Sequence, residues 1–394
     1  MEKGNWDTAR NLSSRKKYSQ WVEINSTSLI NNIHQFRRLI GNEKKLLAMV
    51  KANAYGHGIF EVSSIVLKNG ADWLGVNSVE EGIFLREKGF DCPILVVGYV
   101  PLKSLTEAVT HDLRLTVYNE ETINRLGKIC REQRKKALLH IKVETGTYRQ
   151  GIIEDNLVRF IQGIKFFPEL VIEGISSHFA NIEDTTNHSY AKFQLKNWKR
   201  ILHNLEEINI KVPMKHMSCT ASALLFAQTY FDMVRIGIGM YGLWPSKETY
   251  VSCLLKKHRS VSLKPVLSWK TRIAQIKKVS PSSFIGYGCT YKTTRETLLA
   301  VIPVGYYDGY SRSLSNSSYV LINGKRAPLR GRVAMDFIVV DVSDIPGISL
   351  EDEVVLIGED GGESVSADDL ASWVGSINYE IVSRINPNIP RIVV

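Results

Sequence analysis

The chain has 394 residues, 44% of them hydrophobic, and a formal net charge of +10. This length predicts two domains, because one hydrophobic core rarely extends beyond about 250–300 residues. No stretch approaches the ~18 consecutive apolar residues of a membrane helix, so no membrane span or membrane partner is expected. The positive charge is scattered over amphipathic segments such as 131–136, which favours solvated helix faces over a nucleic-acid surface.

Residues 1–20 are polar and contain Arg15-Lys16-Lys17 without a following apolar segment. They therefore differ from a secretory signal and predict a frayed leader on a cytoplasmic protein. The five cysteines are an odd number and include no C-x-x-C pair or His-Cys cluster at metal-ligand spacing. Neither a disulfide framework nor a metal site is expected.

From about residue 44 the chain alternates between short apolar runs and segments of helical period. The apolar runs are 46–50, 73–76, 93–98, 113–117, 138–143, 171–176, 215–219 and 234–239. Helix-like segments between them include 78–88, 120–134, 157–167 and 190–208. Eight strand–helix units in succession predict an α/β fold of the TIM-type (β/α)8 barrel class, with a doubly wound open sheet as the alternative.

After about residue 256 the composition favours strands and turns, which predicts a mainly β C-terminal domain. Strands are predicted at 266–278, 298–304, 319–322, 332–342 and 353–357, and one helix at 366–374. We therefore expect a leader over 1–20, a barrel over 21–255 and the β domain over 256–394. The strand-like segment 21–25 lies outside the eightfold series and is expected to pair with the β domain.

Lys51 ends the first apolar run and begins the motif Lys51-Ala52-Asn53-Ala54-Tyr55-Gly56-His57-Gly58. Desolvation at the mouth of a buried strand lowers a lysine pKa and leaves neutral amine that can attack an aldehyde. Tyr55 offers a hydroxyl to a phosphate, and Gly56 and Gly58 permit close backbone approach. Position alone favours an ordinary strand-end lysine, so the hypothesis depends on the whole motif.

Other candidate residues also follow predicted strands, where the functional residues of a barrel gather. They are the segment 144–149, His178, Cys219-Thr220 and the segment 235–238. Considered alone, His178 is more typical of a structural histidine and Arg235 of a surface ion pair.

Together these motifs resemble the alanine racemase family over residues 21 to 391. The Lys51 motif is similar to the cofactor-lysine signature, and residues 142–149 resemble the family segment Lys-Val-Asp-Thr-Gly-x-x-Arg. The resemblance implies pyridoxal 5'-phosphate as cofactor and Lys51 as its Schiff-base residue. It also implies that Lys142 can be carbamylated, and that Arg149 holds the substrate carboxylate and the cofactor phenolic oxygen.

The resemblance assigns further residues to the cofactor. Arg235 would hydrogen-bond the pyridine nitrogen, and its permanent charge would keep that nitrogen from holding a full proton. His178 would lie beneath the ring. Phosphate binding would use Tyr55, Thr220, the backbone amides of Gly237 and Ile238, and Tyr379.

The C-terminal domain would contribute the second proton-transferring group. Tyr287, in Gly286-Tyr287-Gly288-Cys289-Thr290-Tyr291, matches the tyrosine that enters the site from the partner subunit in relatives. Racemisation needs one base on each face of the α-carbon, here Lys51 and Tyr287, with His178 and Arg235 tuning the tyrosine. Tyr306, Met335 and Asp336 would line the substrate pocket, and Arg312, Arg332 and Ile377 its entrance.

Some positions depart from the family pattern. Cys219-Thr220 stands where Asn-Ser is more usual, Ala334 replaces a cysteine, and Thr147-Tyr148 replaces smaller residues. None of these changes removes a catalytic group, but each alters the expected pocket shape.

The resemblance thus implies a homodimeric alanine racemase with composite active sites that supplies D-alanine for peptidoglycan. Tyr379 favours alanine over serine, because its loss would open space for a larger polar substrate. A serine or broad-specificity racemase remains an alternative. A basic amino-acid decarboxylase is a second alternative, because Cys289 lies within the Tyr287 motif. A non-catalytic cofactor carrier is disfavoured, because the chain contains the domain with Tyr287.

Overall fold

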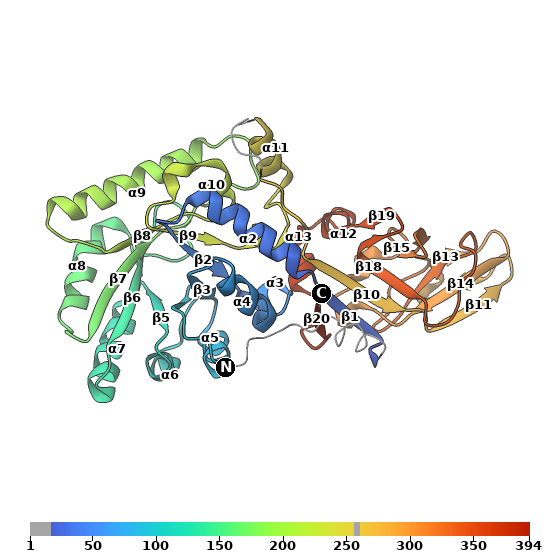
Figure 1. Ribbon diagram of the computed structural model, residues 1–394, viewed down its shortest axis with the longest axis horizontal. Coiled ribbons are helices and arrows are strands. Elements are labelled where there is room, and N and C mark those ends of the chain that lie inside the picture. The colour runs from blue at the N-terminus through green and yellow to red at the C-terminus, as the bar shows by residue number, and fades with distance from the viewer. Residues whose placement is uncertain (1–16, 256–260) are drawn as a thin grey trace. The chain divides into compact units, whose positions relative to one another are not determined.

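The computed structural model describes residues 17–255 and 261–394 and divides into two compact units (Figure 1). The barrel unit comprises Ser28–Ala52 and Val62–Lys264. The β unit comprises the segment up to Thr27, Asn53–Glu61 and Pro265–Val394. The range predicted for the barrel, 21–255, differs because β1 (Gln20–Ile24) and residues 53–61 lie in the β unit and the division falls after Lys264. Residues 1–16 of the predicted leader lie outside the described residues.

Eight parallel strands form the centre of the barrel unit, in the order β8-β7-β6-β5-β4-β3-β2-β9. They are β2 (Lys45–Met49), β3 (Trp73–Val76), β4 (Ile94–Val96), β5 (Arg114–Val117), β6 (Ala137–Lys142), β7 (Leu170–Ser176), β8 (Met214–His216) and β9 (Met233–Ile236). The two end strands also meet, because Asp232 N donates to Lys215 O at 3.0 Å and Arg235 N donates to Ser218 O at 3.2 Å. The predicted TIM-type barrel is confirmed, and the doubly wound sheet is excluded.

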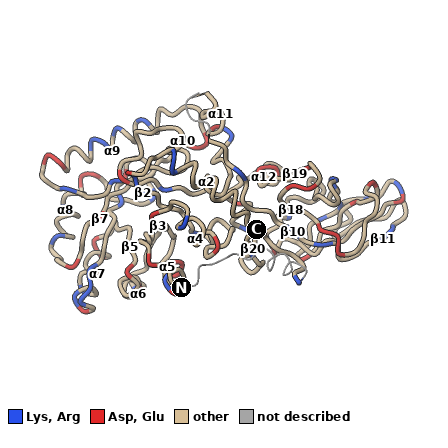
Figure 2. Tube along the Cα trace, in the orientation of Figure 1, with Lys and Arg blue, Asp and Glu red and all other residues tan. Residues whose placement is uncertain are grey.

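Helices cover the outside of these strands, as α7, α8 and α9 do beside β5 to β8 in Figure 1. They are α2 (Ser26–Ile40), α4 (Ile59–Lys68), α5 (Val79–Glu87), α6 (Leu105–Thr110), α7 (Glu120–Gln133), α8 (Glu154–Lys165), α9 (Ser189–Glu207), α10 (Thr220–Leu225) and α11 (Lys247–Leu255). In α7 the buried residues Ile123, Leu126 and Cys130 recur at helical spacing and form the inward stripe. Figure 2 shows Lys and Arg interspersed with Asp and Glu along the barrel helices, the pattern of solvated outer faces.

The β unit is built from two main sheets. The first has the order β16-β15-β18-β10-β1-β20, with β19 (Glu363–Val365) paired to β18, and the second has the order β11-β14-β17. The first contains β1 (Gln20–Ile24), β10 (Leu267–Arg272), β15 (Tyr319–Ile322), β16 (Lys325–Pro328), β18 (Glu353–Asp360) and β20 (Arg391–Val393); the second contains β11 (Gln275–Val279), β14 (Thr297–Ile302) and β17 (Ile338–Asp341). A short ribbon joins β12 (Phe284–Ile285) to β13 (Tyr291–Lys292). Asn323 and Gly324, both at positive φ, form the tight hairpin turn between β15 and β16.

Two strand predictions in this unit are wrong in extent. The predicted strand 266–278 is divided at Ile273 and Ala274, whose amides bond to different neighbours, Asp352 O and Val301 O, so that β10 and β11 enter different sheets. Of the predicted strand 332–342 only β17 is extended, because Ala334 N bonds back to Phe337 O in a turn. The predicted helix 366–374 corresponds to α12 (Ala367–Val374), while α13 (Asn378–Ser383) was not predicted.

Candidate active site

Lys51 lies at the start of α3 (Lys51–Tyr55), directly after the buried end of β2. Residues 52–55 have φ between 51° and 54°, which is left-handed backbone. Such backbone costs ~1–2 kcal/mol per residue when the residue is not glycine. Glu81 ties this turn to the loop after β3, since its Oε1 accepts from Ala52 N at 2.6 Å and its Oε2 from Asn77 N at 2.7 Å. Tertiary contacts thus help to hold the turn that follows Lys51 in a conformation that its local sequence disfavours.

The Lys51 amine is partly desolvated. Burial lowers its pKa, the nearby Arg149 charge lowers it further, and Glu81 opposes both effects. A larger fraction of the amine is therefore neutral at pH 7 than in an exposed lysine, which is the property required of a nucleophilic amine.

Arg235 on β9 is a buried cation of the barrel unit, with only 8% of its surface exposed. Its Nη2 donates to Ser177 O at 2.9 Å, to Met217 O at 3.1 Å and to His178 Nδ1 at 3.3 Å. Burial lowers its pKa to about 10, so the guanidinium stays charged at neutral pH. Because arginine only donates, His178 accepts at Nδ1 and is neutral, in agreement with a pKa that burial and the Lys142 charge lower well below the usual value.

Lys142, at the end of β6, has a pKa well below its ordinary value because of burial, then the charges of Arg235 and Arg149. Glu144 raises this pKa and also anchors the following loop. Its Oε1 accepts from the backbone amides of Thr145 at 2.9 Å, Gly146 at 2.6 Å and Thr147 at 2.5 Å. These bonds fix the loop that ends in Arg149.

Gln194 on α9 connects the same loop to the one that contains His178. Its Oε1 accepts from Ala180 N at 2.8 Å, and its Nε2 donates to His178 O at 3.2 Å and Thr147 Oγ1 at 3.5 Å. The side chain is fully buried. Neither Gln194 nor the role of Glu144 was predicted, because both act on residues that only the fold brings near.

Thr220, Gly237 and Ile238 form a polar turn at the carboxyl ends of β8 and β9. Gly237 N donates to Thr220 Oγ1 at 3.1 Å. A Cβ on Gly239 would lie 2.6 Å from Thr220 Cγ2, so the absence of a side chain there lets the backbone lie against the threonine. A hydroxyl and adjacent backbone amides suit a phosphate dianion, and these residues therefore fit the phosphate of pyridoxal phosphate.

In the β unit, Tyr55 and Tyr379 lie together, with ring centroids 6.1 Å apart. A Cβ on Gly56 would be 1.9 Å from Val382 O, so glycine is required for α13, which contains Tyr379, to approach Tyr55. Arg391 Nη2 donates to Gly56 O at 2.9 Å and secures the same turn. The two tyrosines assigned to the phosphate are thus brought to one place.

Tyr287 is 74% exposed in a short helical turn flanked by Gly286 and Gly288, both at positive φ. A Cβ on Gly288 would lie 2.5 Å from Arg332 Nη1, which places Arg332 beside this turn. Tyr306 is joined to the Met335 loop, because Tyr306 N donates to Ala334 O at 3.0 Å. Asp336 is exposed in the same loop.

The barrel unit thus brings together Lys51, Lys142, Arg149, His178 and Arg235, which influence one another electrostatically. The β unit brings Tyr55 to Tyr379 and Tyr306 to Met335. Three further residues, which were not selected from the sequence, also contact one another in the barrel unit: His140, Glu173 and His216. In the sequence, each of them stands out only as a polar residue within an apolar strand.

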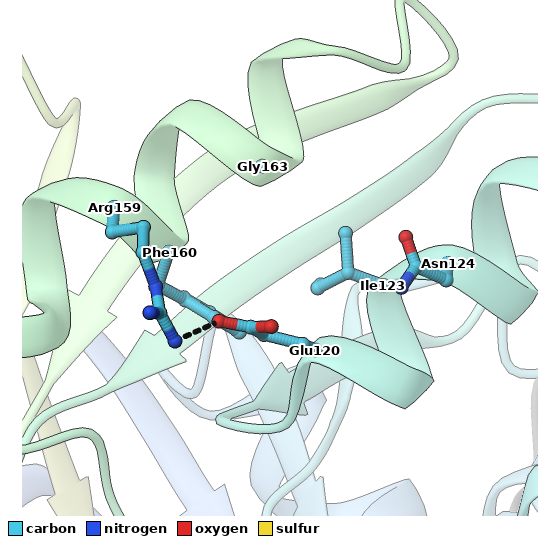
Figure 3. A pocket seen from close by; sticks show the side chains of 6 residues that line it. All are labelled: Glu120, Ile123, Asn124, Arg159, Phe160 and Gly163. Carbon is cyan, nitrogen blue, oxygen red and sulfur yellow. Dashed lines mark hydrogen bonds and ion pairs between the residues drawn. The ribbon is translucent and has the colours of Figure 1, made fainter.

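A separate hollow lies between α7 and α8 on the outer layer of the barrel (Figure 3). Arg159 Nη2 and Glu120 Oε1 pair across it at 2.7 Å. None of the predicted site residues lines this hollow. Within 17–255 and 261–394, no helix is both long and apolar enough to cross a membrane.

Comparison with known proteins agrees with this arrangement. The family models for the alanine racemase N-terminal domain and C-terminal domain match residues 24–245 and 266–393. An alanine racemase from Halothermothrix orenii is 41% identical over 380 residues, which cover 96% of this chain and 98% of that protein. The structure of alanine racemase from Bacillus anthracis with bound L-Ala-P is 35% identical, with a TM-score of 0.89 over 95% of each chain.

A histidine racemase from Leuconostoc mesenteroides shares the fold at 27% identity, with a TM-score of 0.86 over 95% of this chain and 98% of that chain. The family resemblance inferred from the sequence motifs is confirmed over nearly the whole length. The chain therefore belongs to the alanine racemase family, whose members are pyridoxal phosphate-dependent isomerases.

Proposed function

We propose that this protein interconverts L-alanine and D-alanine, with Lys51 and Tyr287 exchanging the α-proton on opposite faces of the substrate. The observation that carries the proposal is the Lys51 amine, whose pKa is lowered by burial at the end of a barrel strand. When bound, pyridoxal phosphate supplies an aldehyde that reacts with amines and a ring that withdraws electrons from the α-carbon.

We assign the phosphate to Thr220, Gly237 and Ile238 of the barrel unit and to the hydroxyls of Tyr55 and Tyr379. Arg235 donates to the pyridine nitrogen. It remains charged at pH 7, so it cannot accept a proton and does not place a full proton on that nitrogen.

Arg149 holds the substrate carboxylate and the phenolic oxygen. The Met335 backbone amide, Tyr306 and Asp336 form the remainder of the substrate contacts. Lys142 is the candidate for carbamylation, because a neutral amine reacts with carbon dioxide and the resulting anion would pair with the neighbouring guanidinium of Arg149.

Lys51 removes or returns the proton on the D face and Tyr287 does so on the L face. His178 and Arg235 belong to the network that tunes the tyrosine. We propose that Tyr287 is supplied by the partner subunit of a homodimer. Two observations support this proposal: the Tyr287 side chain is exposed, and the same unit has further exposed apolar side chains. They are Phe284, Tyr306, Tyr307, Met335, Phe337 and Ile377.

The physiological role we attach to this activity is the cytoplasmic supply of D-alanine for peptidoglycan precursors. A bacterial strain without its own alanine racemase should grow without added D-alanine when it expresses this chain. It should still require D-alanine when it expresses the Lys51→Ala variant.

The substrate is tested by incubating the cofactor-loaded protein with L-alanine, L-serine, L-lysine and L-histidine and separating the enantiomers by chiral chromatography. We expect rapid formation of D-alanine and slower formation of D-serine, since one added hydroxyl is rejected by only ~10²-fold in a shape-based pocket. Lys51→Ala should form the product at least ~10²-fold more slowly. Lys45→Ala, at the other end of the same strand and paired with Asp72 at 3.8 Å, is the matched control and should retain it.

A D-product from serine or histidine but not from alanine would overturn the substrate assignment and keep the reaction class. No product from any of these amino acids would favour a decarboxylase or a cofactor carrier.

A further inference from the structure

Four neighbouring strands of the barrel each contribute one polar side chain to a chain of contacts. Glu173 Oε2 on β7 lies 3.2 Å from His140 Nε2 on β6, and His140 Nδ1 lies 2.8 Å from His216 Nε2 on β8. His216 Nδ1 lies 2.6 Å from Arg235 Nη1 on β9. Both histidines are at most 1% exposed. We call this series, Glu173-His140-His216-Arg235, the relay.

The direction of every hydrogen bond in the relay follows from its two ends. A guanidinium only donates, so Arg235 Nη1 donates and His216 Nδ1 accepts. The proton of His216 is then on Nε2 and is donated to His140 Nδ1. His140 in turn carries its proton on Nε2 and donates it to the Glu173 carboxylate, which only accepts when ionised.

A protonated histidine does not fit this geometry. Protonation of His216 would set an N–H at Nδ1 against an Arg235 N–H at 2.6 Å, and protonation of His140 would do the same at the 2.8 Å contact with His216. Burial, as the largest cause, also lowers the pKa of both histidines. Both rings are therefore neutral.

The relay ends at a less buried charge pair. Arg114 Nε lies 3.6 Å from Glu173 Oε2, and the Glu173 side chain is 21% exposed. The ring of Trp73 packs against His140 with centroids 5.6 Å apart at 72°. A carboxyl group paired with Arg114 thus stands at one end of the relay, and the Arg235 guanidinium stands at the other.

We propose that His216, His140 and Glu173 are positioning residues that hold Arg235 in one orientation and polarise its guanidinium through two neutral Nε2-protonated histidines. This rests on the proposed role of Arg235 at the pyridine nitrogen. Hydrogen bonds in a buried chain polarise one another, so the Glu173 charge strengthens the donor that faces the site. The relay is separate from the contacts of Arg235 with Ser177 and Met217, which fix its other terminal nitrogen.

The tautomers are tested by nitrogen NMR of the ¹⁵N-histidine-labelled protein at pH 7, with His140→Gln and His216→Gln variants to assign the signals. We expect both rings to be neutral, with a bare Nδ1 and a proton on Nε2. A proton on Nδ1 of either ring, or on both nitrogens, would overturn the relay. This readout does not depend on any catalytic activity, so it separates failure of the relay from failure of the proposed function.

The positioning role is tested with Glu173→Gln, which keeps an acceptor oxygen and removes the charge. We expect a fall in kcat of about 10-fold, since a charged acceptor is roughly twice as strong as a neutral one, with KM changed less than 3-fold. The absorption maximum of the bound cofactor should shift in the same variant, and Glu173→Asp should restore part of kcat.

Glu169→Gln is the matched control. Glu169 precedes the same strand but pairs with Arg131 on the outer surface, at 3.4 Å. It should leave kcat, KM and the absorption maximum unchanged. A Glu173→Gln enzyme with the wild-type kcat and cofactor spectrum would overturn the positioning role.

Discussion

At the scale of single residues, the site depends on side chains whose pKa values are all lowered, but by different causes. Lys51 and Lys142 lose basicity because of burial, while Glu144 becomes more acidic through its backbone hydrogen bonds. Amines with lowered pKa beside a permanently charged Arg235 can stay neutral and exchange protons. This separation of roles is what a proton-transfer reaction requires.

Glu144 gives a prediction about stability and pH. Burial raises the pKa of this carboxyl, but its several backbone hydrogen bonds together outweigh burial and hold the pKa in the folded protein below the unfolded value. Its contribution is therefore fully present above the unfolded pKa of about 4.3 and is lost as the pH falls through the folded pKa. We expect Glu144→Gln to reduce the free energy of unfolding by about 1 kcal/mol at pH 7, because the group is partly exposed, and by less near pH 3.5. Urea unfolding at both pH values measures this.

The matched control is Glu132→Gln, which removes an exposed carboxylate from α7. It should change the unfolding free energy little at either pH. An equal effect of Glu144→Gln at pH 7 and pH 3.5 would contradict the anchoring role. The KM of Glu144→Gln should also rise several-fold, because the loop that ends in Arg149 is loosened.

At the scale of elements, the backbone around α3 combines strain with close packing. Residues 52–55 are left-handed, and Gly56 continues at φ +83° against Val382 O. The turn therefore couples the end of the Lys51 strand to the position of Tyr55.

Gly56→Ala tests this turn against a control of identical φ. Gly89 also has φ +83° but has no atom within 4 Å of an added Cβ. Gly89→Ala should cost ~1 kcal/mol from left-handed backbone alone. Gly56→Ala should cost at least ~2 kcal/mol more, because its Cβ would overlap the Val382 carbonyl, and it should weaken cofactor binding. Similar unfolding midpoints for the two variants would refute the packing argument.

Most elements of the barrel could be predicted because their apolar runs are short and continuous, as expected for parallel strands buried on both faces. The strand at Trp73–Val76 was predicted at its full extent. The relay could not be predicted, because His140, Glu173 and His216 are distant in sequence and meet only when β6, β7 and β8 align. The division of 266–278 into β10 and β11 depends on bonds to Asp352 and Val301, which no local pattern reveals.

At the scale of the whole molecule, the proposed reaction needs groups from both units. Lys51 lies in the barrel unit, and Tyr287 lies in the β unit, where it is 74% exposed. An aromatic side chain that is so exposed contributes little to its own fold, so its proposed use is in the site of a second copy.

Mixing two inactive variants tests whether Tyr287 acts in the active site of the partner subunit. Lys51→Ala and Tyr287→Phe should each lose ~10²–10⁴-fold in kcat, the usual contribution of a general acid or base. After subunit exchange, random pairing in a two-fold dimer gives one intact site in each mixed dimer, so about a quarter of wild-type activity should return. No recovery, with exchange verified by mass spectrometry of tagged subunits, would show that both bases come from one chain.

The most direct test of the two-base reaction is the isotope content of the first product formed in deuterium oxide. L-alanine with protium at its α-carbon is supplied to the cofactor-loaded protein, and D-alanine is isolated before one per cent of the substrate has reacted. Because separate groups remove and deliver the proton, we expect D-alanine that carries deuterium at the α-carbon, with the same result in the reverse direction. Substantial retention of protium in the product, in either direction, would mean that one group carries the proton from one face to the other and would contradict the two-base reaction.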